Sequence, residues 1–326
     1  MAKRKTKRSA KKAAPASAPK PAPQPAAPKA KKDAKPKPKV YPPWSEFVRD
    51  ASHTEITNRA SRELKSLIRK AEAKFPDTCF VLLLDSGTSI SNFELDRIYQ
   101  SLTTHNKDKS KDVTLIIQSP GGEIEPAYQI SKVCKAFAKE KFRVVVPRYA
   151  KSAATLISLG ADEIHMGPLS HLGPIDPQIG GLPALGVARA LTTIAELSEA
   201  HPGSAEMFSK YLNQALTVEQ IGYCERISES AEQYAQRLLA TKENLPRKGA
   251  LIAKELVHEY KDHGFVIDVS EAQEHLGDHW VLDDTPLLGV GEDIYTLYEL
   301  ITMYVRIYKK RKVLVIGDPG TIVLAG

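Results

Sequence analysis

Short continuous apolar runs alternate with helical stretches along the middle of this chain, and this alternation limits the folds open to it. The apolar runs predict strands at residues 79–84, 113–117, 142–146 and 163–166, and the stretches between them predict helices at 93–103, 124–137 and 152–159. Strands that are apolar at every position are buried on both faces, which is typical of a parallel sheet covered by helices. We therefore expect an α/β fold with a largely parallel sheet, whose ligand site lies at the carboxyl ends of the strands.

The remainder of the chain is mostly helical. A helix is expected at 54–74 before the first strand, and further helices are expected at 191–197, 205–212, 218–239 and 248–260. A last helix at 293–308 leads into a strand at 313–316. Because no internal repeat or sharp linker interrupts residues 41–326, we expect one α/β domain with additional C-terminal helices.

Residues 1–40 differ from the rest in composition. They hold 14 Lys and Arg residues against one acid, a charge of +13, together with eight prolines. Since the whole chain carries a formal +7, residues 41–326 carry −6. A segment with so little to bury is expected to be a disordered tail. Its charge would attract DNA, RNA or another polyanion, or the tail could serve only as a solubilising spacer.

Membrane, secreted and disulfide-rich classes are all disfavoured. No run of about 18 apolar residues is present, so no membrane span is expected. The N-terminal stretch lacks the apolar core of a secretory signal. Cys79, Cys134 and Cys224 are far apart and form no CxxC pair, so we expect three core residues of a cytoplasmic protein and no zinc site.

A pair of glycines follows the second predicted strand, in Ser119-Pro120-Gly121-Gly122. Two glycines let the backbone turn tightly and present free N–H groups to a phosphate or to an oxyanion. A phosphate site is disfavoured because neither a Lys-Ser/Thr pair nor a Gly-x-Gly-x-x-Gly pattern accompanies the turn. Taken alone, the motif predicts only a turn.

Two further motifs lie after the third predicted strand. Ser152 stands at the start of a short helix among small residues, which would leave a nucleophilic hydroxyl room for substrate; taken alone, it is predicted to be a helix N-cap. A rigid loop from Ser170 to Gln178 then holds Asp176 between Ile175 and Pro177, which alone predicts a turn. The three motifs in this order, at consecutive strand ends, are more specific than any one of them.

This order resembles the Clp-protease/crotonase superfamily, in which a Ser-Pro-Gly-Gly turn at a strand end donates an oxyanion hole. More closely, residues 144–178, VVVPRYAKSAATLISLGADEIHMGPLSHLGPIDPQ, resemble the serine dehydrogenase proteinase family. These are Clp-like serine proteases related to signal peptide peptidase A. The similarity covers residues 81–178 and returns more loosely at 262–268, and it implies a Clp/crotonase-like fold.

The resemblance also implies an active site with a Ser-Asp-His triad. The matching positions are Ser152 as nucleophile, Asp176 and His263 as its partners, and the backbone N–H groups of Gly121 or Gly122 and of Ala153 as oxyanion hole. Clp proteases have the order Ser-His-Asp, so Asp176 and His263 exchange places relative to them. Since only an imidazole is suited to shuttle the proton near neutral pH, His263 must still reach the hydroxyl of Ser152.

Two other side chains remain candidate bases. His171 lies on the loop of Asp176, at a position that is usually acidic in the family, and could be a substitute base or merely a polar loop residue. Lys151 would form a Ser-Lys dyad like that of signal peptide peptidases, although neighbouring side chains tend to diverge at such a turn. The remaining polar-face histidines, His201, His258, His275 and His279, are expected to be solvated or capping.

We therefore expect a cytoplasmic serine peptidase that forms an acyl-enzyme on Ser152 and needs no metal, cofactor or nucleotide by itself. The superfamily implies a homo-oligomer acting on a peptide or protein substrate, with candidate subunit contacts between residues 188 and 260. One alternative is a catalytically inactive Clp-fold scaffold tethered to nucleic acid by residues 1–40. Another is a crotonase-like acyl-CoA enzyme, which would use the same oxyanion hole without a serine nucleophile.

Overall fold

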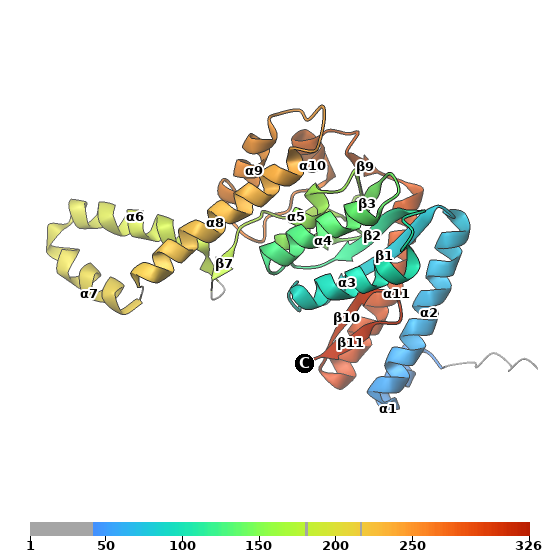
Figure 1. Ribbon diagram of the computed structural model, residues 1–326. Coiled ribbons are helices and arrows are strands. Elements are labelled where there is room, and N and C mark those ends of the chain that lie inside the picture. The colour runs from blue at the N-terminus through green and yellow to red at the C-terminus, as the bar shows by residue number, and fades with distance from the viewer. Residues whose placement is uncertain (1–41, 180–181, 216) are drawn as a thin grey trace, which may run out of the picture. The chain divides into compact units, whose positions relative to one another are not determined.

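The computed structural model describes residues 42–179, 182–215 and 217–326 (Figure 1). The tail predicted at residues 1–40 lies outside this part of the chain. The described strands and helices alternate as the sequence predicts. None of the described helices is both long enough and apolar enough to cross a membrane.

A seven-stranded sheet forms the centre of the described chain, in the order β11-β10-β1-β2-β3-β5-β9 (Figure 1). Its strands are β1 (Thr78–Asp85), β2 (Asp112–Gln118), β3 (Phe142–Val145), β5 (Glu163–Met166), β9 (Val281–Asp283), β10 (Lys312–Gly317) and β11 (Ile322–Ala325). The strands from β1 to β9 run parallel, whereas β10 is antiparallel to both β1 and β11. The predicted α/β fold with a largely parallel sheet is therefore confirmed.

Two short strand pairs lie outside this sheet. β4 (Tyr149–Ala150) pairs in parallel with β6 (His171–Leu172), and β7 (Gln178–Ile179) pairs antiparallel with β8 (Leu182–Pro183). The first pair joins the segments that precede Ser152 and Asp176, so it bears directly on the candidate site.

Helices cover both faces of the large sheet. α1 (Trp44–Asp50), α2 (His53–Lys74) and α11 (Pro286–Lys309) pack on one face, and α3 (Asn92–His105), α4 (Ile124–Phe137) and α5 (Ala153–Leu159) pack on the other. Residues 79–84 of β1 are all apolar because their side chains alternate between two cores: Phe80, Leu82 and Leu84 face the first group of helices, and Cys79, Val81 and Leu83 face the second. Each fully buried aliphatic side chain of this kind contributes about 1.5–3 kcal/mol.

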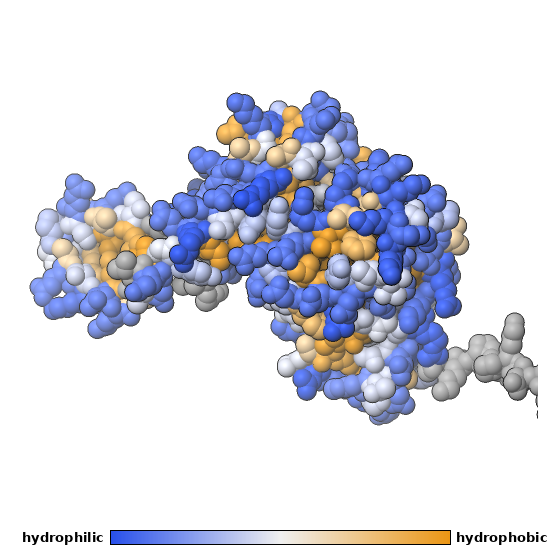
Figure 2. Space-filling model, in the orientation of Figure 1, coloured by the Kyte–Doolittle hydropathy of each residue, from blue (hydrophilic) through white to orange (hydrophobic). Residues whose placement is uncertain are grey.

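Additional helices follow β5, and the sequence predicts four of the five. They are α6 (Ala184–Ala200), α7 (Ala205–Ala215), α8 (Val218–Leu239), α9 (Gly249–His258) and α10 (Val269–Leu276), with a 3₁₀ turn at Pro202–Ser204. Helix α8 packs against α5, α6 and α9, whereas no residue of α7 that the structure describes is buried. Figure 2 shows apolar side chains gathered over α6 and α7. The sequence did not predict the short elements α1, α10, β9 and β11.

Helix α11 begins earlier than the predicted residue 293. The Thr285 hydroxyl accepts a hydrogen bond of 3.1 Å from the N–H of Leu288, which caps a helix that starts at Pro286. Gly291 continues the helix close to the sheet, since a Cβ there would lie 2.6 Å from Val145 Cγ1. Gly291 therefore serves close packing of the helix against the sheet.

The cysteines Cys79, Cys134 and Cys224 are free and buried, as expected for core residues. Burial raises the pKa of the Cys79 thiol to about 11 and raises that of Cys134 as well. Neither group is therefore a thiolate at neutral pH, and neither has the chemistry of a reactive cysteine.

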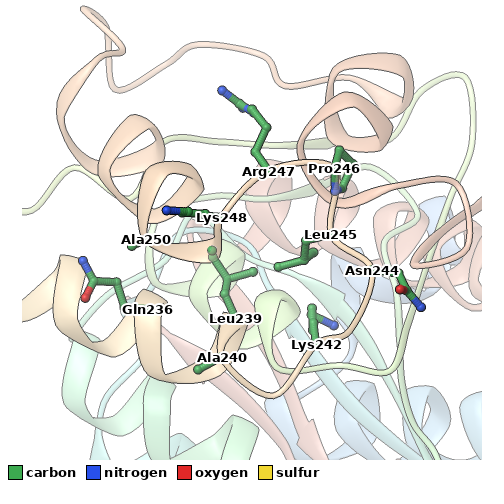
Figure 3. A pocket seen from close by; sticks show the side chains of 11 residues that line it. Gln236, Leu239, Ala240, Lys242, Asn244, Leu245, Pro246, Arg247, Lys248 and Ala250 are labelled. Carbon is green, nitrogen blue, oxygen red and sulfur yellow. The ribbon is translucent and has the colours of Figure 1, made fainter.

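Lys242, in the loop after α8, brings a charge into the interior. Only 9% of the residue is exposed, its ammonium donates a hydrogen bond to the Ala161 carbonyl, and its Nζ lies 3.8 Å from the centre of the Trp280 ring. Burial lowers its pKa from 10.5 to about 7. In Figure 3, Arg247 and Lys248 reach away from Lys242, so the cations around this hollow do not converge on one anion site.

Lys242→Met is expected to stabilise the protein by roughly 1–3 kcal/mol at pH 6, because it removes a charge that is costly to bury. The unfolded chain holds this proton up to about pH 10.5 and the folded chain only to about 7, so the free energy of unfolding of the native protein rises between these values. The variant should lack this rise. Urea unfolding at pH 6 and pH 9 measures both effects, with exposed Lys254→Met as control; a variant that is less stable at both pH values would contradict the prediction.

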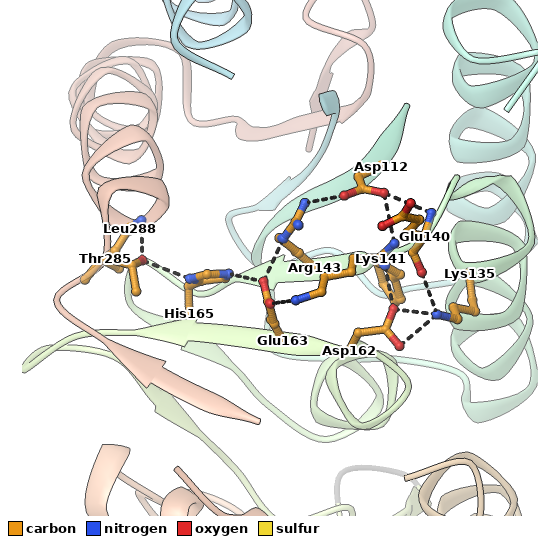
Figure 4. A network of polar contacts seen from close by, with 11 residues as sticks. Asp112, Lys135, Glu140, Lys141, Arg143, Asp162, Glu163, His165, Thr285 and Leu288 are labelled. Carbon is orange, nitrogen blue, oxygen red and sulfur yellow. Dashed lines mark hydrogen bonds and ion pairs between the residues drawn. The ribbon is translucent and has the colours of Figure 1, made fainter. Parts of the chain in front are cut away.

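A network of charges joins the amino ends of the parallel strands (Figure 4). Arg143 on β3 contacts Asp112 at 3.0 Å and Glu163 at 2.7 Å, and so bridges the starts of β2 and β5. His165, then Lys141 and Arg143, hold the pKa of the Glu163 carboxyl well below its ordinary value. These residues lie at the edge of the sheet opposite the strand ends that carry the candidate site, and we assign them a structural role.

Candidate active site

Ser152 occupies a strained turn between β4 and α5. Its backbone has φ 52° and ψ −119°, a region that residues other than glycine rarely adopt. Its side chain makes no capping hydrogen bond, so the interpretation of Ser152 as a simple N-cap is wrong. Holding such a residue in place costs about 1–3 kcal/mol, and strain of this kind concentrates at active sites. The residue is 9% exposed, so its hydroxyl is partly withdrawn from water.

The glycine pair at the end of β2 packs against this turn. Gly121 has φ 110°, and a Cβ on it would lie 2.7 Å from the Lys151 carbonyl oxygen and 2.8 Å from Ser152 Cβ. A Cβ on Gly122 would lie 2.2 Å from the backbone nitrogen of Ile90. Neither position therefore has room for a side chain. The absence of a side chain on Gly121 allows the turn to pack directly against Ser152.

The backbone donors of this region differ in their availability. The N–H of Gly121 donates to Ser119 Oγ at 3.1 Å. The N–H groups of Gly122 and Ala153 have no hydrogen-bond partner among the described residues. Free N–H groups on either side of a nucleophile are what an oxyanion requires.

Asp176 and His263, far apart in the chain, are brought together. Asp176 lies after β6 and is 5% exposed, and the Ile175 N–H just before it donates to the Leu256 carbonyl of α9 at 2.8 Å. Its Oδ2 lies 3.8 Å from Nδ1 of His263, in the turn between α9 and α10. Both Asp176 Oδ1 and His263 Nδ1 are buried without a hydrogen bond to any described residue. The pair thus faces one another slightly beyond hydrogen-bond distance.

A cavity of about 730 Å³ joins these parts, with Ser152, His263, Gly121 and Gly122 on its walls. Ser152 Oγ donates no hydrogen bond to His263 or to another residue of the described chain, and catalytic hydrogen bonds are often unformed in free enzymes. Helix α8 adds four side chains that sequence analysis missed: Tyr223, Arg226, Ile227 and Ser230. The helical pattern predicts α8 itself, but no local signal indicates which of its faces meets the cavity.

Neither alternative base lies on this cavity wall. His171 is on β6, where its ring lies 5.8 Å from that of Tyr149, and burial, then the charge of Lys151, lower its pKa. The Lys151 ammonium donates to the Gly264 carbonyl at 3.0 Å. Its side chain is therefore engaged by the turn of His263 and does not line the cavity beside Ser152.

His275 is expected from the sequence to be solvated or capping, and the first of these alternatives is wrong. It is 4% exposed, its Nδ1 lies 2.7 Å from the Arg247 guanidinium, and its Nε2 lies 2.8 Å from the Tyr260 hydroxyl. Since Arg247 can only donate, His275 accepts at Nδ1 and donates at Nε2, which requires a neutral ring. Burial lowers its pKa in the same sense. The ring of Tyr260 in turn lies 4.8 Å from that of Phe265, so this cluster supports the turn that carries His263.

Among the described residues, no group of three or more His, Cys, Asp or Glu side chains could hold a metal ion.

Comparisons with known proteins point to one family. A family model described as ClpP-like SDH-type serine proteinase matches residues 89–321. An uncharacterised protein of Methanocaldococcus jannaschii is 32% identical over 257 residues, which cover 77% of this chain and 78% of that protein. A second uncharacterised protein of that organism is 33% identical over 162 residues, half of each chain.

Solved structures with similarity to the chain include two proteases. A variant of the membrane-bound stomatin-specific protease 1510-N, in complex with a substrate peptide, has a TM-score of 0.40 and 15% identity, covering 74% of this chain and 86% of its own. ClpP1 from Listeria monocytogenes has a TM-score of 0.38 and 18% identity, covering 64% of this chain and 94% of its own.

Proposed function

Since this chain belongs to the ClpP-like SDH-type serine proteinases, we propose that it is itself a serine peptidase that cleaves peptide bonds through an acyl-enzyme on Ser152. The observation that carries the proposal is the conformation of Ser152. A strained serine is held against a glycine turn, at the wall of a cavity that also receives an imidazole. An inactive scaffold would gain nothing from this strain, whereas a nucleophile gains a hydroxyl that is held at the cavity wall.

In the proposed mechanism His263 is the general base. Its Nδ1 faces Asp176, which leaves Nε2 for the proton of Ser152 Oγ. As Oγ forms its bond to the scissile carbonyl carbon, Nε2 takes that proton and then gives it to the leaving amine. Asp176 holds the ring in the required tautomer and stabilises the imidazolium, and a shift of about 1 Å would complete its hydrogen bond to Nδ1.

The proposed oxyanion hole consists of the N–H groups of Gly122 and Ala153. Their lack of other partners supports this assignment over one that uses Gly121, whose N–H already donates to Ser119 Oγ. Backbone donors of this kind stabilise the negative oxygen of the tetrahedral intermediate, and losing one typically costs about 10²–10³-fold in kcat.

Several finer features stay predictions: a cytoplasmic location, independence of ATP, and assembly into a homo-oligomer. The last is supported by α7, where Met207 and Tyr211 are 61% and 64% exposed. We propose that this helix contacts another copy of the chain, and light scattering on the intact protein measures the number of copies.

Covalent labelling tests the proposal. A biotinylated fluorophosphonate should label the native chain once, on Ser152, and peptide hydrolysis should fall in proportion to labelling, as mapped by peptide mass spectrometry. Denatured protein is the control, because its serines are not activated. Labelling of a different serine would refute the assignment, and thioester turnover by the fully labelled protein would favour the acyl-CoA alternative instead.

A further inference from the structure

Lys151 precedes Ser152, and its backbone is part of the same turn. Its N–H donates to the Ser119 carbonyl at 3.0 Å, and its own carbonyl accepts a hydrogen bond of 2.9 Å from the N–H of Ala154. The main chain of Lys151 therefore joins the glycine turn to the start of α5. A contact that fixes the side chain of Lys151 therefore also helps to fix the segment that carries Ser152.

The stem of the Lys151 side chain lies across the loop that leads to Asp176. A Cβ built on Gly173 would lie 3.0 Å from Lys151 Cγ and 3.2 Å from its Cβ. The glycine therefore leaves space for this stem, and a larger residue would displace it.

The end of the same side chain reaches the turn of His263. Lys151 Nζ donates to the carbonyl of Gly264, the residue after His263, at 3.0 Å. Lys151 thus belongs to the segment of Ser152, and its side chain contacts the other two segments that carry the proposed triad. A hydrogen bond from an ammonium is stronger than one between neutral groups, which suits a contact that fixes distance.

Other contacts fix the shape of this turn and its far end. The Gly264 N–H donates to the Asp262 carboxylate at 2.9 Å, and the Phe265 N–H donates to the Asp262 carbonyl at 3.0 Å. Ile267 exchanges two backbone hydrogen bonds, of 2.9 and 3.1 Å, with Leu172. These contacts orient the turn internally and toward the Asp176 loop, so Lys151 is left to set its distance from Ser152.

We infer that Lys151 is a positioning residue, whose ammonium holds the His263 turn at the distance from Ser152 and Asp176 that proton transfer requires. The inference rests on the proposed function. Its amine is engaged as a hydrogen-bond donor, and Lys151 does not line the cavity on which Ser152 lies, so it does not act as a base. A small displacement of this turn would change the distance between His263 Nδ1 and Asp176 Oδ2, which is 3.8 Å.

Two substitutions separate positioning from base catalysis. Lys151→Met keeps the stem and removes the donor, and is expected to lower kcat for peptide hydrolysis roughly 100-fold, with KM changed less than about twofold, as a misplacement near 1 Å would. Lys151→Arg keeps a donor that cannot be deprotonated, and should retain activity to within about fivefold. If the arginine variant is as inactive as the methionine variant, Lys151 acts as a base and the inference is overturned.

A double-mutant cycle with His263→Ala tests whether Lys151 acts through His263. Lys151→Met should then cause almost no further loss of residual activity, because the group it positions is gone. An equal loss in both backgrounds would contradict the inference, as would an unchanged rate of fluorophosphonate labelling in Lys151→Met. Melting temperatures of the variants, with Lys254→Met as control, show whether a loss of activity comes from unfolding. If Lys151→Met unfolds, the activity of Lys151→Arg still distinguishes positioning from base catalysis. Absence of labelling at Ser152 in the native chain would instead refute the proposed function itself.

Discussion

Alanine at Ser152 or at His263 is expected to lower kcat for peptide hydrolysis by about 10⁴-fold or more, since nucleophile and base act as one unit. Ser152→Ala removes the atom that forms the acyl-enzyme. His263→Ala removes the imidazole that shares the cavity wall with Ser152. Steady-state hydrolysis of a fluorogenic peptide measures both losses, and circular dichroism verifies that each variant is folded.

Combining the two substitutions should cost little more than either alone. Once the nucleophile is gone, the base has no proton to accept, and the residual rate comes from substrate binding and the oxyanion hole. Losses that multiply in the double variant would mean that Ser152 and His263 act independently, which is incompatible with a triad.

Asp176→Asn should lower kcat by about 10⁴-fold while leaving the protein folded. An amide in this place favours the wrong tautomer of His263 and no longer stabilises the imidazolium. The matched control is His171→Ala, which removes the other nearby imidazole and should change kcat less than about threefold, because His171 contacts Tyr149 away from the cavity. If His171→Ala lowered kcat far more than His263→Ala, His171 rather than His263 would be the general base.

The central strands of the sheet can be predicted from the local sequence, whereas the short elements at its margins cannot. A strand such as β1 is buried on both faces, so its unbroken apolar run predicts both the strand and its place in a parallel sheet. Elements such as β9, with three residues, and α1, with seven, are too short to show a period. Helix α11 starts at Pro286 rather than at the predicted residue 293, and the close approach of Gly291 to Val145 that fits this first part against the sheet depends on the tertiary structure.

In the candidate site, too, some residues can be predicted from the local sequence and others cannot. Ser152 and the glycine pair could be located because each is fixed by its own strand end and turn. The approach of His263 to Asp176 depends on how the turn after α9 folds back over the β6 loop, through the pairing of Ile267 with Leu172. Only the resemblance to a family indicated this pair, and no feature of the sequence indicated which side of α8 reaches the cavity.

Gly121→Ala is expected to lower kcat by about 10²–10³-fold and the free energy of unfolding by roughly 1–3 kcal/mol. The new methyl group would lie 2.7 Å from the Lys151 carbonyl oxygen and 2.8 Å from Ser152 Cβ, and both neighbours belong to the strained turn. The residue would also be held at φ 110°, which only glycine adopts readily. The turn must therefore retreat from Ser152 and carry the N–H of Gly122 away from the oxyanion.

Gly289→Ala is the matched control, because a Cβ at this exposed position of α11 meets nothing within 4 Å. It should stabilise the protein by up to about 1 kcal/mol through helix propensity and leave kcat unchanged. Thermal or urea unfolding and peptide hydrolysis of the two variants separate the general effect of alanine from the local one. If Gly121→Ala kept the native kcat and stability, the close packing of the glycine turn against Ser152 would not matter for catalysis. The oxyanion hole would then have to be sought elsewhere on the cavity wall.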